Sequence, residues 1–157
     1  MTESIDTISQ NIMKAYIAQM QSALKISNIL SEHNSDSKEL SGDDIICGLV
    51  YRLMIPMSNT EMMESLVEAN RIMESDGSDG SDGSDESDGS DEEYDEIEEK
   101  YEKPSISRKI KTNTCNCDIC SKARVCLINF SDYDPTDQLA QKFKDSITET
   151  CEIHKIH

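Results

Sequence analysis

The chain has 157 residues, no Trp, six Cys and a formal net charge of −17. Most of that charge is local, because residues 74–102 hold 15 Asp or Glu against one Lys. No stretch approaches the roughly 20 apolar residues of a membrane span, and the N-terminal residues lack the basic start and apolar run of a secretory signal. We therefore expect an intracellular protein with no membrane contact.

Composition divides the chain into three parts. All eight Met lie in residues 1–73, both Phe lie after residue 125, and Ser-Asp-Gly repeats lie between them. We predict an all-α protein with a helical module at 1–74, a disordered acidic linker at 75–104 and a metal-binding helical module at 105–157. The linker would act as a flexible spacer or as a phosphoacceptor tract.

Three helices are predicted in the N-terminal module. Residues 5–30 form a long amphipathic pattern, with an apolar stripe that repeats every four residues from Ile8 to Leu24. Ser-x-x-Asp/Glu capping boxes at Ser41 and Ser58 start the next two helices, and Pro56 ends the first of them. The Met-rich faces favour a protein partner or self-association, or the ordinary core of a small bundle.

Two helices are predicted in the C-terminal module. The first begins in a cysteine turn and carries apolar residues at helical spacing from Ile119 to Phe130. The second is predicted to start at Asp134 as N-cap, with Pro135 in the first helical position. Its apolar stripe runs through Ile147 and continues to Cys151 and His154. A module this small needs a metal, disulfides or a partner for stability.

Clustered cysteines of an intracellular protein favour a metal over disulfides, although free thiols are a further alternative. Cys-x-x-Cys in a tight turn and Cys-x-x-His at a helix end can together supply the four soft ligands of tetrahedral Zn2+. The predicted zinc ligands are Cys117, Cys120, Cys151 and His154. Cys115 could replace Cys117, His157 could replace His154, and Cys126 is a third alternate whose place on the apolar stripe favours burial.

The motifs favour a non-enzymatic protein, with zinc folding a small module for interaction or structure. No metalloprotease, deaminase, phosphate-loop or serine-nucleophile motif is present, so we expect no small-molecule substrate. The alternative is zinc-dependent nucleic-acid binding through the basic segment 103–125. Its candidate contacts are Arg108, Lys109, Lys111, Lys122 and Arg124.

The last 45 or so residues, from TCNCDICSKARVCLINF to TETCEIHKI, resemble the C-terminal region of small zinc-binding-like proteins encoded by giant amoeba-infecting DNA viruses. The resemblance implies a viral protein made in host cytoplasm, with packaging in the virion as a further expectation. It would make the Cys and His residues named above the shared core of that family. It transfers no catalytic residue.

Overall fold

The computed structural model of the protein describes residues 4–77 and 106–157. These residues form an all-α fold, as predicted, with one isolated β-bridge between Arg108 and Ile156 and no longer strand within the described ranges. The helices are α1 (Ile5–Glu32), α2 (Gly42–Met54), α3 (Asn59–Gly77), α4 (Asp118–Asn129) and α5 (Gln138–Ile153), with a 3-10 turn at Phe130–Asp132. None of these helices combines the length and apolarity needed to cross a membrane.

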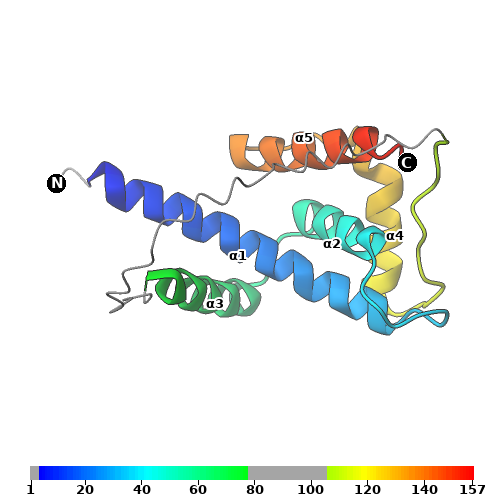
Figure 1. The fold of residues 1–157 in the computed structure, drawn as a ribbon, viewed down its shortest axis with the longest axis horizontal. Coiled ribbons are helices and arrows are strands. Elements are labelled where there is room, and N and C mark those ends of the chain that lie inside the picture. Colours follow the sequence, from blue (N-terminus) through cyan, green and yellow to red (C-terminus); the bar gives the residue numbers. More distant parts are fainter. Residues whose placement is uncertain (1–3, 78–105) are drawn as a thin grey trace, which may run out of the picture.

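The long helix α1 organises the molecule. In Figure 1, α3 lies on one side of α1, α2 and α5 lie on the other, and α4 stands across the ends of α1 and α2. The buried residues of α1 all lie between Ala18 and Ser31. The predicted four-residue stripe is therefore not the buried face, because Ile8, Ile12 and Leu24 are exposed. Self-association through these helices stays a prediction.

Local sequence signals place the starts of α2 and α3 as predicted. Ser41 Oγ accepts a hydrogen bond from the backbone N–H of Asp44, and the Asp44 carboxylate accepts one from the N–H of Ser41. Ser58 and Glu61 repeat this reciprocal arrangement at α3. Each pair satisfies two backbone donors that the first turn of a helix leaves unpaired.

The predicted start of α5 is wrong by three residues. The N-cap is Asp137, whose Oδ1 accepts the Ala140 N–H at 2.8 Å, and not Asp134. The 3-10 turn after α4 leads into extended backbone at Tyr133, whose hydroxyl donates to the carbonyl of Leu53 in α2 at 3.4 Å. Residues 133–136 therefore remain outside a helix, and α5 begins at Gln138.

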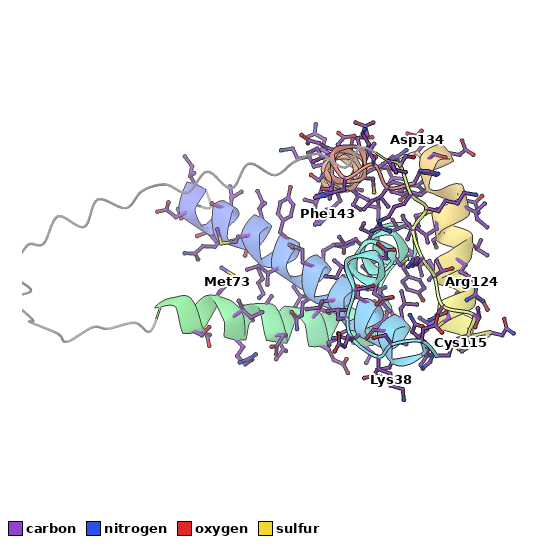
Figure 2. The ribbon with its side chains drawn as sticks, turned by 45° about the vertical axis from the view of Figure 1, so that its right-hand side comes forward. Lys38, Met73, Cys115, Arg124, Asp134 and Phe143 are labelled. Atoms are coloured by element: carbon purple, nitrogen blue, oxygen red, sulfur yellow. The ribbon has the colours of Figure 1, made fainter. Side chains whose placement is uncertain are left out.

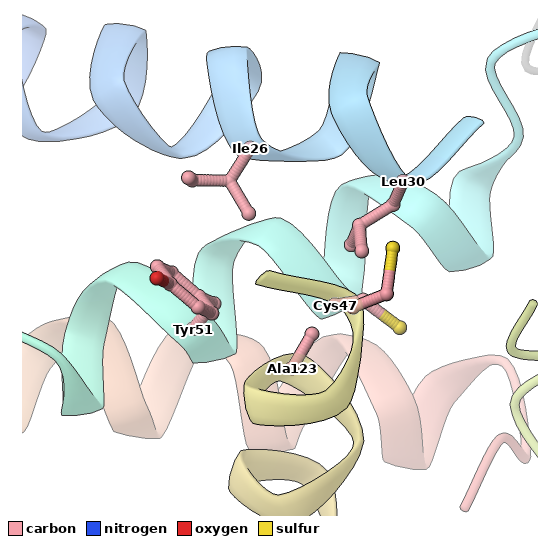
Figure 3. Close-up of a cluster of buried hydrophobic side chains, with 6 residues drawn as sticks. Ile26, Leu30, Cys47, Tyr51 and Ala123 are labelled. Atoms are coloured by element: carbon pink, nitrogen blue, oxygen red, sulfur yellow. The ribbon is translucent and has the colours of Figure 1, made fainter. Parts of the chain in front are cut away.

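The two predicted modules pack against each other through two buried clusters. One buried cluster joins Ile26, Leu30, Cys47 and Tyr51 of α1 and α2 to Cys120 and Ala123 of α4 (Figure 3). A second joins Ile46 and Val50 of α2 to Cys126 of α4 and Ile147 of α5. Residues 75–77 of the predicted linker belong to α3, and its remainder, 78–104, lies outside the described residues.

Candidate metal centre

Four potential metal ligands converge where α1 ends and α4 begins. The ligand atoms of His33, Cys115, Cys117 and Cys120 all lie within 4.8 Å of one another. Cys115 lies at the lower end of α4 in Figure 2, close to the last turn of α1. Cys120 is 1% exposed, Cys115 and Cys117 are half-buried and His33 is exposed, so the cluster lies at the surface with one buried corner.

Helix ends position these side chains. His33 is the C-cap of α1, and its backbone N–H donates to the carbonyls of Ile29 and Ser31. Cys117 is the N-cap of α4, and its sulfur accepts the N–H of Cys120 at 3.4 Å. The Cys115 sulfur in turn accepts the N–H of Cys117 at 3.4 Å. Backbone N–H groups at a helix N-terminus favour negative charge, and thus thiolates, at this place.

Three cysteine sulfur atoms surround a single ring nitrogen of His33. Its Nδ1 lies 3.5 Å from the sulfur of Cys115, 3.3 Å from that of Cys117 and 3.4 Å from that of Cys120. One ring nitrogen has either a single N–H or a single in-plane lone pair, so it cannot make three hydrogen bonds. Four ligand atoms at the corners of a polyhedron around one ion account for all three distances together, and the cluster could therefore hold a metal ion.

The thiols differ in their ionisation. The backbone N–H of Cys120, with smaller contributions from neighbouring side chains, lowers the pKa of Cys117 to about 6. Burial raises the pKa of Cys120 to about 12, although the side-chain amide of Asn113 donates to its sulfur at 3.3 Å. Cys117 therefore offers a thiolate at neutral pH, whereas a metal would displace a proton from Cys120.

Asn113 and Arg124 brace the loop that carries the cysteines. Asn113 is buried, and its amide donates both to the Cys120 sulfur and to the carbonyl of Leu30, one of the last carbonyls of α1. Arg124 of α4 donates to the backbone and side-chain carbonyls of Asn113 at 3.0 and 3.2 Å. These bonds hold α1, the loop and α4 together around the four ligands.

The structure brings together only part of the predicted ligand set. Cys117 and Cys120 are in the cluster, and so is the alternate Cys115. Cys151 is not: it packs half-buried against the second core cluster, in which the alternate Cys126 is itself buried. His154 is the C-cap of α5, and the His157 ring lies 3.3 Å from the hydroxyl of Ser107. The fourth potential ligand of the cluster is His33.

The basic residues of the nucleic-acid alternative are partly engaged within the protein. Both terminal nitrogens of Arg108 donate to the Asp43 carboxylate at 2.8 Å. Lys122 pairs with Asp118 at 3.1 Å, and Arg124 is bonded to the cysteine loop. Lys109 and Lys111 are exposed on the same segment.

Sequence reasoning missed His33 and Asn113. One signal pointed to His33: Cys-x-Cys-x-x-Cys already supplies three ligands, and His33 is the only His outside the last four residues of the chain. Its position in the polar break that ends the first helix also suits a cap residue. Nothing in the sequence singled out Asn113, whose role depends on contacts with Leu30 and Cys120 that only the fold creates.

Comparison with known proteins gives no evidence on family or function, since no protein-family model, curated protein or solved structure matches this chain. The resemblance to virus-encoded proteins therefore stays a prediction.

Proposed function

We propose that the protein binds one Zn2+ through His33, Cys115, Cys117 and Cys120, and that the metal has a structural role in a non-enzymatic interaction protein. The observation that carries this proposal is the convergence of three sulfur atoms on a single imidazole nitrogen, at 3.3–3.5 Å.

Zinc fits this donor set in chemistry and in size. Thiolate and imidazole ligands suit Zn2+, with Zn–S of about 2.3 Å and Zn–N of about 2.0–2.1 Å. A tetrahedron with those bond lengths places a sulfur about 3.6 Å from the nitrogen. The three separations in the protein are within a few tenths of an ångström of that value.

The number of protein ligands supports a structural site. Structural zinc has four protein ligands, whereas catalytic zinc has three and keeps a position for water or substrate. All four corners here would be filled by side chains of this chain. Asn113 and the N–H groups of Cys117 and Cys120 would support the sulfurs from outside the coordination shell, as such sites require.

The metal would join the two halves of the chain. His33 and Cys115 are 82 positions apart, so a metal ion bound to both would close a long loop. Closing a loop of this size is worth about 4–5 kcal/mol in the chain-entropy treatment of covalent cross-links. Zinc would thus fix the end of α1 against the start of α4, in addition to the buried cluster that joins these helices and the hydrogen bonds of Asn113.

Metal removal from the purified full chain tests this function. We expect about one zinc per chain by elemental analysis, a lower thermal midpoint by circular dichroism after chelation, and recovery on adding Zn2+ but not Mg2+. The expected loss is on the order of 10 °C or more, because zinc bound to a folded site adds its binding free energy to stability. An unchanged melting curve after complete zinc removal would contradict the structural role.

A further inference from the structure

A groove lies beside the cysteine loop, between the segment after residue 106 and the outer face of α4. Its volume is about 310 Å³. Three apolar side chains (Ile110, Leu127 and Ile128) and three basic or imidazole side chains (Lys109, Arg124 and His157) line it. Ile128 is 77% exposed, and Val125, one turn earlier on α4, is 55% exposed. A cavity of this size accommodates one or two large aliphatic side chains.

The charge of the groove is opposite to that of the chain. The protein carries a formal net charge of −17, yet no acidic residue of the described ranges lines this groove. An exposed apolar floor edged by cations is complementary to an apolar side chain flanked by carboxylates.

We propose that this groove binds an acidic segment of a partner protein, which inserts an aliphatic side chain over Leu127 and Ile128 and places carboxylates against Lys109 and Arg124. This proposal deepens the structural role of zinc and rests on it, since the proposed metal loop holds one wall of the groove.

Both walls of the groove are fixed by contacts outside it. On one side, the backbone N–H of Ile110 donates to the carbonyl of His157 at 2.8 Å, and the His157 N–H donates to the carbonyl of Arg108 at 2.9 Å. On the other side, Arg124 is held by Asn113, whose amide also bonds the Cys120 sulfur. The metal centre would therefore set the position of the Arg124 guanidinium, and a preformed site binds with a smaller entropic cost.

The lining favours a peptide over a nucleic acid. Proteins that bind single strands stack bases on aromatic rings, and no Phe or Tyr of the described residues lines this groove; its one ring is the imidazole of His157. Duplex binding needs a row of free cations along the backbone. Here Arg108 and Lys122 are paired with carboxylates of the protein itself.

Fluorescence anisotropy with the full-length, zinc-loaded protein tests the groove. The probe is a fluorescein-labelled peptide of about twelve residues, with Leu at every third or fourth position among Glu residues. Saturable binding that weakens with added salt is expected. Ile128→Glu should weaken it at least about tenfold, since it places a carboxylate where the aliphatic anchor would pack. Lys109→Glu should weaken it and reduce the salt dependence.

Matched controls separate this site from general charge effects. Val67→Glu on α3 and Lys142→Glu on α5 make the same chemical changes at exposed positions outside the groove, and should leave binding unchanged. Zinc content is measured on every variant. Normal zinc with no peptide binding, or equal binding by Ile128→Glu and the wild type, would overturn the groove proposal and leave the zinc proposal intact. Absence of zinc would instead overturn the metal centre.

A labelled oligo-dT strand in the same assay tests the competing partner. No binding at physiological salt is expected. Tighter binding of the strand than of the peptide, lost in Lys109→Glu, would overturn the assignment to an acidic peptide.

Discussion

Asp43 is the residue that ties the segment after residue 106 to the start of α2. Its carboxylate is buried and accepts bonds from both terminal nitrogens of Arg108 and from the backbone N–H of Lys111, each at 2.8 Å. It also lies in the first turn of α2, where negative charge is favoured. A buried carboxylate with this many charge-assisted and backbone partners contributes more than an exposed ion pair would.

Asp43→Asn should lower the free energy of unfolding at pH 7 by about 1–3 kcal/mol, because it replaces a carboxylate bonded to a cation by a neutral amide. The side-chain bond from Arg108 lowers the pKa of Asp43 from its ordinary value of 3.8. The stabilisation by the Asp43 carboxylate is therefore complete above pH 3.8, and it is lost as pH falls through the lower pKa of the folded state.

Urea unfolding of the wild type and of Asp43→Asn from about pH 7 down to about pH 3 measures this effect, with Asp36→Asn as the exposed control. We expect the difference in free energy of unfolding between Asp43→Asn and the wild type to shrink only at the acid end of this pH range. If Asp43→Asn were less stable than the wild type by the same amount at every pH, Asp43 would stabilise the fold through packing and neutral hydrogen bonds and not through its charge.

The membership of the Cys/His cluster was only partly predictable from the sequence. Cys117 and Cys120 follow from local spacing, because two cysteines three apart at a helix start must face the same point. His33 lies 87 positions from Cys120 and reaches it only through the packing of α1 on α2 and α4. The helical spacing of Cys151 and His154 was equally compatible with core packing and capping, and these are the positions that the structure assigns to them.

At the scale of helices, Gly48 sets how closely α2 approaches α1. A Cβ at this position would lie 1.9 Å from Ser27 Oγ and 2.6 Å from the carbonyl oxygen of Ala23. Ser27 is fully buried and donates to the same carbonyl at 3.1 Å. The contact therefore involves the backbone of α1, which cannot move aside as a flexible side chain can.

Gly48→Ala should destabilise the protein by about 1–3 kcal/mol, although alanine is the better helix former. The overlap forces α2 away from α1 and loosens the cluster around Ile26 and Cys47. Chemical denaturation measures the loss, and Gly42→Ala is the control, because a Cβ there meets nothing within 4 Å. Equal stability of Gly48→Ala and the wild type would show that the two helices are not in this close contact.

Helix starts were more predictable than helix faces. The capping boxes at Ser41 and Ser58 are local and hold in the structure. A strict four-residue repeat advances about 40° per step around a helix, so Ile8 and Leu24 end on faces about 160° apart. The buried face at Ala23, Ile26 and Leu30 follows the helical period of 3.6 instead. Asp134 offered a strong local cap, but the N-cap of α5 is Asp137, and the neighbouring Tyr133 is hydrogen-bonded to Leu53 of α2.

At the scale of the whole molecule, the described residues on either side of 78–105 form a shared core. Cys120 and Ala123 of α4 pack on Ile26 and Cys47 of α1 and α2, and Ile147 of α5 packs on α2. The all-α class was predictable from periodicity, whereas this packing depends on pairings of distant residues that local patterns do not encode. The proposed metal centre lies at the junction of these two halves.

Zinc content of two histidine variants tests the central claim most directly. Full-length wild type, His33→Ala and His154→Ala would be purified in parallel and their zinc-to-protein ratios compared under competition with a chelator. We predict that His154→Ala keeps about one zinc per chain and that His33→Ala loses it or holds it far more weakly. Loss of zinc from His154→Ala with retention in His33→Ala would contradict the account, and would place the metal between the cysteine turn and the end of α5.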